Sequence, residues 1–148
     1  MLGAGEAIVV KISTRVKDLM DEKIFTVDAD ATVAQALKAM LQNDVWSVIV
    51  VEKGMPIGVV VEHDVLQRCV GKGLDVNRVK AREIMSSPLI QIDGDAPVGE
   101  AMKKLEEASV KRLYIVENGK VVGRITEKSV LEGALNLMMT LSSVTSSA

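Results

Sequence analysis

The residues best able to do chemistry are few, and they gather at two short polar corners of the sequence. The first corner is Glu62-His63-Asp64, which follows the apolar run 58–61. Corners between a strand and a helix commonly carry ligand-binding side chains. His63 is the only histidine and Cys69 the only cysteine. A histidine-rich metal site or a Cys/His catalytic pair therefore cannot be assembled within one chain.

The second corner is a copy of the first. The run 123–131 matches the run 58–66 at a constant offset, and identities at the same offset continue through both halves without a gap. Such self-similarity indicates an internal duplication. Glu62 and Glu127 are equivalent by this repeat, and duplicated acids on solvated corners do not make a general acid/base pair. The sequence therefore predicts no catalytic residues and no enzyme.

The hydrophobic pattern of the first half predicts the elements that position the first corner. Residues 16–20 indicate a helical turn, and Asp30 is expected to cap a helix whose apolar stripe runs from Val33 to Leu41. Strands are predicted at 24–27, 45–51 and 56–61, and an extended segment at 7–12. A helix beginning near Glu62 is expected to turn four residues inward, namely Val65, Leu66, Cys69 and Val70.

The second half repeats this plan. Pro97 suits the first turn of a helix, and Asn118-Gly119 is a strong hairpin signal between predicted strands at 112–116 and 121–126. The preceding helix is expected to bury Val98, Ala101, Met102 and Leu105. A last helix is predicted at 127–141, with Leu131, Leu135 and Met138 on one face. The domain boundaries follow as 7–73 and 74–141, with a flexible tail at 142–148.

Composition limits the classes of function. The 148 residues are 48% hydrophobic, so they can bury a real core, and the net charge is -2. Without a basic field or a run of aromatic rings, nucleic-acid binding is not expected. No stretch is apolar enough to span a membrane, and a single cysteine suits a reducing compartment, so the sequence predicts a cytoplasmic protein.

The order βαββα, found twice, resembles a known family. Together with the phrase PIGVVVEHDVL at 56–66 and the phrase EIMSSP at 83–88, it is similar to the paired CBS domains of a Bateman module. The resemblance covers residues 9–138. It implies an α+β fold of two tandem CBS repeats related by pseudo-two-fold symmetry.

The resemblance also implies a function. CBS pairs are regulatory modules that often bind AMP, ADP or ATP, and sometimes S-adenosylmethionine, without requiring a cofactor. In the family pattern Gly-h-h-Thr/Ser-x-x-Asp, the aspartate grips the ribose. A carboxylate can accept hydrogen bonds from both ribose hydroxyls, and basic groups can meet phosphate. We therefore expect a ligand-sensing module that signals to a separate, unidentified protein.

Each copy departs from the family pattern at one position. The first corner keeps Asp64 but has Val61 in place of the hydroxyl, and the second keeps Thr126 but has Ser129 in place of the acid. In the family, each ligand-binding cleft combines the corner of one copy with residues of the other. The resemblance therefore implies a first cleft, at the first corner, that contains Asp64, Val59, Val61, Ile90, Val110, Lys111, Arg112 and Lys128. The second cleft, which has no carboxylate, is expected to contain Phe25, Val45, Trp46, Ser47, Arg124, Thr126 and Ser129. We expect the first cleft to bind nucleotide and the second to be empty, weak or adapted to another ligand.

Several alternatives stay open at this point. Asp64 can be a helix cap alone, Lys111 and Arg112 can be solvated charges, and Trp46 can serve packing or an interface. A second function is a homodimerising scaffold with vestigial clefts, since CBS pairs commonly form homodimers through their helices. The Met-rich tract 134–141 could supply such a surface.

Overall fold

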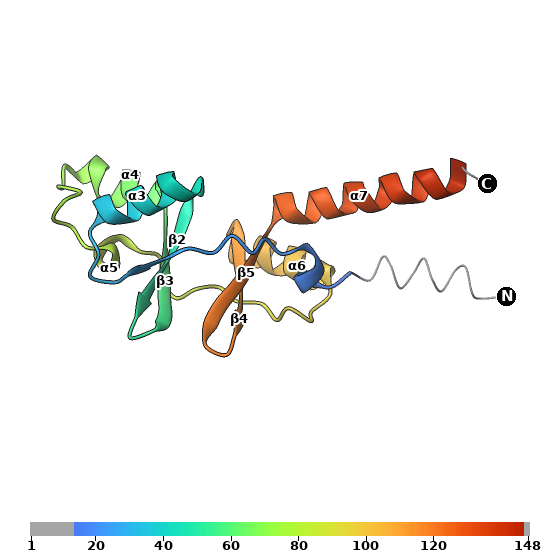
Figure 1. Cartoon of the computed structure of the whole chain (residues 1–148), viewed down its shortest axis with the longest axis horizontal. Helices are drawn as coiled ribbons and strands as arrows, with labels where there is room; N and C mark the ends of the chain where they lie inside the picture. Colours follow the sequence, from blue (N-terminus) through green and yellow to red (C-terminus); the bar gives the residue numbers. More distant parts are fainter. Residues whose placement is uncertain (1–13, 147–148) are drawn as a thin grey trace. The chain divides into compact units, whose positions relative to one another are not determined.

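The structure is a computed structural model that describes residues 14–146. The extended segment predicted at 7–12 lies outside the described residues. Figure 1 shows a mixed α+β chain in which the order βαββα is followed by a second, similar run, as predicted. The elements in chain order are α2 Val16–Leu19, β1 Thr26–Asp28, α3 Val33–Asn43, β2 Ser47–Glu52, β3 Met55–Val61, α4 Glu62–Arg68, the 3-10 turn η1 Val70–Lys72, α5 Ala81–Ile84, α6 Val98–Ala108, β4 Arg112–Glu117, β5 Lys120–Thr126 and α7 Glu127–Ser146.

The first copy is a three-stranded sheet with helices. Strand β1 pairs in parallel with β2, and β2 pairs antiparallel with β3. Valine and isoleucine dominate β2 and β3, and their branched side chains favour a pleated, buried surface. Ser47 lies opposite Val61 in this register, so the pairing brings the start of β2 beside the end of β3, where the first corner begins.

Helix α3 is capped by Thr32, and the prediction that Asp30 caps it was wrong. The Thr32 hydroxyl accepts a hydrogen bond of 3.1 Å from the Gln35 N–H, and the Gln35 side chain accepts one of 2.8 Å from the Thr32 N–H. This reciprocal capping box satisfies two N–H groups at once. Asp30 is left to bind cations instead, as described below.

The second copy has a smaller sheet. Strands β4 and β5 form a two-stranded sheet, and the strand equivalent to β1 is reduced to a single parallel bridge between Gln91 and Tyr114. The predicted hairpin turn is confirmed, because Asn118 and Gly119 have φ angles of 51° and 75°, the left-handed values that such turns require.

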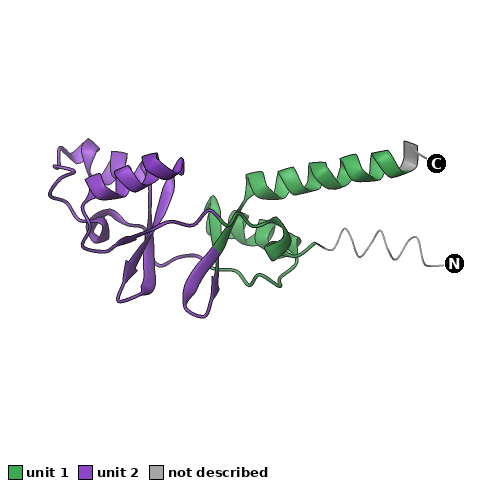
Figure 2. Cartoon of the chain, viewed as in Figure 1, with its two compact units in different colours: residues 1–22, 91–115, 123–148 green, residues 23–90, 116–122 purple. Residues whose placement is uncertain are grey.

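The chain forms two compact units that interleave in sequence (Figure 2). Unit 1 comprises residues 1–22, 91–115 and 123–148, and unit 2 comprises residues 23–90 and 116–122. The short helix α2 therefore belongs to the unit of the second copy, and α5 belongs to the unit of the first copy. The short helix that precedes one copy in the sequence thus packs in the unit of the other copy.

Burial corrects four of the predicted inward residues, the first of which is Leu41 of α3, which is 75% exposed. Val65 and Cys69 are buried, but Leu66 and Val70 are exposed, because each follows a buried residue by one position and so lies about 100° further round the helix axis. In α6, Ala101 and Leu105 are buried and Met102 is exposed. The core of unit 2 is formed by Ala29, Val33, Ala36, Met40, Val48, Val50, Val60, Val65, Cys69, Ala81 and Ile84.

Helix α7 is longer than predicted. It continues to Ser146, whereas the Ser- and Thr-rich end of the chain predicts an end near Leu141. Serine and threonine lower helix propensity by only a few tenths of a kcal/mol each, roughly, and no glycine or proline follows Gly133 to stop the helix.

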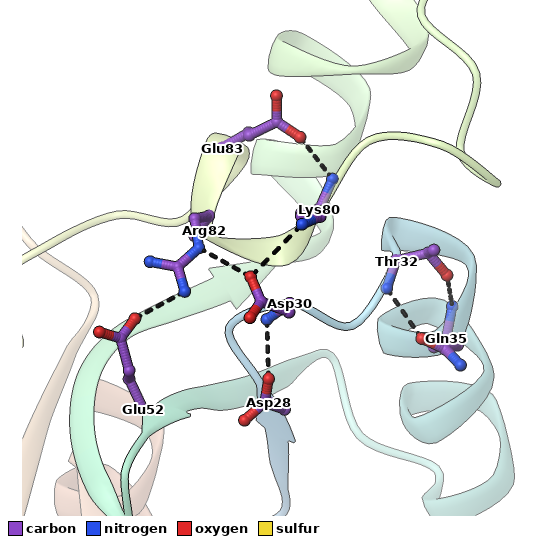
Figure 3. A network of polar contacts seen from close by, with 8 residues as sticks. All are labelled: Asp28, Asp30, Thr32, Gln35, Glu52, Lys80, Arg82 and Glu83. Atoms are coloured by element: carbon purple, nitrogen blue, oxygen red, sulfur yellow. Dashed lines mark hydrogen bonds and ion pairs between the residues drawn. The ribbon is translucent and has the colours of Figure 1, made fainter.

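An ion-pair network holds α5 against the first copy (Figure 3). The Asp30 carboxylate lies 3.1 Å from Arg82 Nε and 3.6 Å from Lys80 Nζ, and Arg82 Nη2 lies 2.7 Å from Glu52 Oε2. The hydrogen bond and charge of Arg82 hold the pKa of Asp30 below its usual value, and Glu52 together with Asp30 raises the pKa of Arg82. Ion pairs thus join three segments of unit 2, which carry Asp30, Glu52 and Arg82.

The same arrangement recurs in unit 1. Asp95, which the repeat aligns with Asp30, lies 2.7 Å from Lys17 Nζ and 3.3 Å from Arg15 Nη1. The hydrogen bond from Lys17 lowers the pKa of Asp95, and the pKa of Lys17 rises in return. The duplication has therefore preserved the way in which each short helix is attached, with Lys17 in place of Arg82.

Candidate functional site

The first corner holds a buried carboxylate. Strand β3 ends at Val61 and α4 begins at Glu62, so Asp64 is the third residue of the helix. Its Oδ2 accepts a hydrogen bond of 3.0 Å from the Val61 N–H, and the residue is only 4% exposed. This bond satisfies an N–H that the first turn of a helix leaves without a partner. Asp64 therefore does cap the helix, which was one of the two roles considered for it.

The other oxygen of Asp64 is bound from the segment that follows α5. Ser86 Oγ donates a hydrogen bond of 3.0 Å to Asp64 Oδ1, and Arg68 Nε lies 3.9 Å from the same oxygen. Ser86 is itself fixed by two backbone hydrogen bonds with Val59, of 3.0 and 2.8 Å. An ionised carboxylate offers about four lone-pair positions, so two hydrogen bonds leave it able to accept others. Two hydrogen bonds thus hold the Asp64 carboxylate in place, and part of its capacity to accept hydrogen bonds stays unused.

A glycine allows this close approach. A Cβ at Gly58 would lie 2.7 Å from Met85 Sδ and 2.8 Å from the Ser86 carbonyl oxygen. Distances below 3.0 Å are too short for a Cβ, so β3 can approach the segment carrying Ser86 only with glycine here. Gly58 thus positions the hydroxyl that binds Asp64.

Several predicted residues of both clefts lie at this end of the unit 2 sheet. Ser47 is the register partner of Val61, the Glu62 N–H donates to the Trp46 carbonyl at 3.3 Å, and the Ile49 N–H donates to the Phe25 carbonyl at 2.8 Å. Trp46 is 58% exposed, whereas Val45, Ser47 and Val59 are buried and Ile90 is half-buried. An exposed Trp46 does not fit the packing role considered for it.

The second corner caps its helix differently. Thr126 Oγ1 accepts a hydrogen bond of 3.0 Å from the Ser129 N–H, and it lies 2.9 Å from Ser129 Oγ. A hydroxyl at the position before the helix thus replaces the carboxylate inside it as the capping group.

A carboxylate nevertheless lies beside the second corner, and sequence reasoning missed it. Asp21 Oδ2 accepts hydrogen bonds from Arg124 Nε at 3.3 Å and Arg124 Nη2 at 3.1 Å, and the two backbones exchange hydrogen bonds of 2.8 and 2.9 Å. The statement that this cleft has no carboxylate was therefore wrong, because Arg124 brings one with it. The repeat offset places Asp21 on Ser86, and this alignment could have found it.

The remaining predicted residues of the first cleft belong to unit 1. Val110 and Arg112 are half-buried, Lys111 is exposed, and these residues join α6 to β4. Lys128 is exposed on α7, with its Nζ 4.0 Å from Glu132 Oε1. Their approach to Asp64 stays a prediction.

The described residues contain no group of three histidine, cysteine, aspartate or glutamate side chains that could hold a metal ion. His63 is exposed at the start of α4, and Cys69 is a buried free thiol. Within the same part of the chain, even the longest helix lacks the length and hydropathy of a membrane-spanning segment.

Comparisons with known proteins agree with this fold. Residues 16–71 and 81–136 each match the CBS domain. The chain is 32% identical over 131 residues to an uncharacterized protein of Methanopyrus kandleri, covering 87% of this chain and 67% of that protein. An uncharacterized conserved protein from Pyrococcus horikoshii has a crystal structure similar to this one, with a TM-score of 0.75 and 29% identity, covering 83% of this chain and 93% of that one.

A further similar structure is the hexameric CBS-CP12 protein from bloom-forming cyanobacteria, with a TM-score of 0.74 and 22% identity over 80% of this chain and 67% of that one. Two CBS repeats and a CBS fold define the class. The chain belongs to the CBS-domain family, a class of regulatory and signal-transduction modules.

Proposed function

We propose that the chain is a sensor of adenine nucleotides, of the AMP, ADP or ATP class, and that Asp64 binds the ribose. The observation that carries the proposal is the buried carboxylate of Asp64, held in place by the Val61 N–H and the Ser86 hydroxyl. Because its position is set before a ligand arrives, little side-chain entropy is lost when the two ribose hydroxyls bind. A carboxylate used for capping alone would need only one of its oxygens.

The rest of the ligand would be recognised by groups of two kinds. Aliphatic side chains suit the base, and the family resemblance assigns Val59, Val61, Ile90 and Val110 to that surface. Cations suit the phosphates, and the resemblance assigns Lys111, Arg112 and Lys128 to them. An aliphatic surface does not distinguish a nucleotide from S-adenosylmethionine, which is therefore included in the test below.

The geometry of the first corner supports a route for the signal. Asp64 binds Ser86, and Arg68 donates to the carbonyl oxygens of Ile84 and Met85 at 3.2 and 2.8 Å. Ile84, Met85 and Ser86 lie in the segment that connects the first copy to the second. A ligand that binds the remaining acceptor positions of the Asp64 carboxylate would be coupled to this segment through Ser86, and a partner protein would respond to the arrangement that binds the ligand more tightly.

The experiment is isothermal titration of the wild-type protein with AMP, ADP, ATP and S-adenosylmethionine in parallel. The proposal predicts saturable binding of at least one adenine nucleotide near one ligand per chain. It also predicts that the ligand raises the unfolding temperature, because binding to the folded state stabilises it. Absence of both heat and thermal stabilisation with every ligand would contradict the proposal.

A second candidate function is a homodimeric scaffold, and helix α7 favours it. Large apolar side chains stay exposed along its length, at Leu131, Leu135, Met138, Met139 and Val144. The stretch 133–146 carries no charged residue. A helix that is neither charged nor covered gains little from propensity alone, so a partner helix would stabilise it.

The spacing of α7 residues indicates how two copies could pack. Apolar residues follow one another at alternating steps of four and three, which is the seam of a coiled coil. They are Leu131, Leu135 and Met138, and all three are exposed. Because no charge flanks the distal part of this seam, nothing opposes pairing with an identical helix. The hexamer formed by the cyanobacterial CBS-CP12 protein is consistent with association in proteins of this fold.

Sedimentation velocity over a range of protein concentrations tests this candidate. Wild-type protein is expected to sediment as a dimer, and Leu135→Asp as a monomer, since a buried charge without a partner opposes association. Asn136→Asp adds the same charge to an exposed position off the seam and should leave the dimer intact. A wild type that is monomeric at all concentrations, or equal behaviour of the two variants, would exclude a dimer through α7.

A further inference from the structure

We infer that Arg124 and Asp21 fill the second corner from within the chain, so that the module binds one adenosyl ligand and not two. The inference concerns residues of unit 1 only. It rests on the proposed function, because it explains why the duplicated corner does not supply a duplicated site.

The repeat aligns four positions of the two corners. The first corner has Val59, Val61, Asp64 and Ser86, and the second has Arg124, Thr126, Ser129 and Asp21. The acid and the hydroxyl have exchanged places. In the first corner the acid is on the helix and the hydroxyl on the short segment bonded to the strand. In the second corner the hydroxyl is on the helix and the acid on that segment.

The backbone makes this alignment a structural one. Val59 and Ser86 exchange two backbone hydrogen bonds, and so do Arg124 and Asp21. The glycine before each strand residue also behaves alike, since a Cβ at Gly58 would meet Met85 and a Cβ at Gly123 would meet Met20. Asp21 therefore occupies the place of Ser86, and Arg124 that of Val59.

The consequence for a ligand follows from the partners of the two acids. Asp64 is bound by a backbone N–H and a hydroxyl, whereas Asp21 Oδ2 is bound twice by one guanidinium. The Arg124 side chain is only 15% exposed. A ribose would have to displace a largely buried cation from its carboxylate, and leaving such a charge without its partner is strongly unfavourable. Arg124 also places a long side chain where the first corner has a valine.

The helix end does not compensate for this change. Ser129 stands where the ribose-binding acid is expected, and its hydroxyl lies 2.9 Å from Thr126 Oγ1. It carries no charge, so it cannot offer the two strong acceptor oxygens of a carboxylate. The second corner has thus lost the acid on the helix and neutralised the acid beside it.

The test converts the second corner into a first corner. The triple variant Asp21→Ser, Arg124→Val and Ser129→Asp copies the aligned residues of the first corner. It removes both members of the ion pair together, so no unpaired charge is left. It also completes a capping box with Thr126. We titrate AMP, or the adenine nucleotide that the wild type binds most tightly. The stoichiometry is expected to rise from one ligand per chain in the wild type to two in the triple variant.

Two further variants make the result specific. The double variant Asp21→Ser, Arg124→Val opens the corner without supplying an acid, and it should stay at one ligand per chain. If the triple variant does not fold, the double exchange Val59→Arg, Ser86→Asp in the first corner replaces it, and that protein, although it keeps Asp64, should bind no ligand.

The outcomes separate the inference from the proposed function. Two ligands per chain in the wild type would overturn the inference alone. So would a folded triple variant that still binds one ligand, or, where the first-corner exchange is used, a folded Val59→Arg, Ser86→Asp variant that still binds one. A wild type that binds none of the nucleotides would contradict the proposed function, and the inference with it.

Discussion

The two corners perform the same local task with opposite halves of one motif. A complete capping box would place a hydroxyl before the helix and an acid at its third residue. The first corner keeps only the acid, with Asp64 accepting from the Val61 N–H, and the second keeps only the hydroxyl, with Thr126 accepting from the Ser129 N–H. Either half satisfies the helix, so capping does not explain why Asp64 is an acid. The difference is that only the first corner places an acid on its helix.

The helices that follow the corners differ as well. Helix α4 spans Glu62–Arg68 and packs Val65 and Cys69 into the core, whereas α7 spans Glu127–Ser146 and leaves most of its large apolar side chains exposed. The proposed binding site therefore lies in the first copy, and the proposed association surface lies on the last helix of the second. Duplicated modules can divide tasks in this way without any change of fold.

The largest expected difference between the copies concerns their equivalent glycines. In Gly58→Ala the new Cβ would meet the Ser86 carbonyl oxygen at 2.8 Å, and in Gly123→Ala the nearest backbone atom is the Asp21 carbonyl oxygen at 3.3 Å. Backbone cannot move aside as readily as the end of a methionine side chain. We expect Gly58→Ala to lower the free energy of unfolding by about 2–3 kcal/mol and Gly123→Ala by about 1 kcal/mol. Urea unfolding of both variants measures this, and equal losses would refute the proposed difference in packing.

A smaller effect is expected from the caps. Thr126→Ala removes the acceptor for the Ser129 N–H and should lower the free energy of unfolding by about 1 kcal/mol. Thr126→Ser, which keeps the hydroxyl, is the matched control. Val61→Thr adds the missing half of the first capping box and should raise stability by about 0.5–1 kcal/mol. Thermal unfolding of the three proteins checks the assignment, and a neutral Thr126→Ala would argue against hydroxyl capping at the second corner.

The smallest effect concerns the exposed ion pairs that attach α5 and α2. The pKa values of Asp30 and Asp95 are lowered, chiefly by hydrogen bonds from Arg82 and Lys17. A carboxyl whose pKa is lower in the folded than in the unfolded chain stabilises the folded state at pH values above the unfolded pKa. This contribution is lost as the pH falls below about 4. Arg82→Met and Lys17→Met should therefore weaken the loss of stability in acid. Unfolding followed between neutral and acid pH measures this, and an unchanged pH dependence in both variants would show that the pairs contribute nothing.

Much of the fold can be predicted from local patterns. The repeat offset, the branched strands and the Asn118-Gly119 turn each depend on neighbouring residues, and the structure confirms the elements they predict. The corner at Asp64 was found in the same way, because its acid directly follows a strand and precedes an apolar helical stripe.

What could not be predicted depends on contacts between distant segments. Asp30 has the right type for a cap, but Thr32 caps the helix and Asp30 binds Arg82, far along the chain. Asp21 becomes relevant only because its segment pairs with Arg124, a contact across most of the sequence. The length of α7 follows from weak propensities that no stop signal interrupts.

The most direct test of the central claim is a parallel titration of AMP into the wild type, Asp64→Asn and Ser129→Ala. Asp64→Asn keeps the shape of the side chain and removes its charge. Hydrogen bonds to a charged group contribute about 1.5–3 kcal/mol each, so losing two of them should weaken affinity at least 100-fold, roughly, while Ser129→Ala binds like the wild type. Binding of equal affinity in the wild type and Asp64→Asn would contradict the claim that the first corner is the nucleotide site.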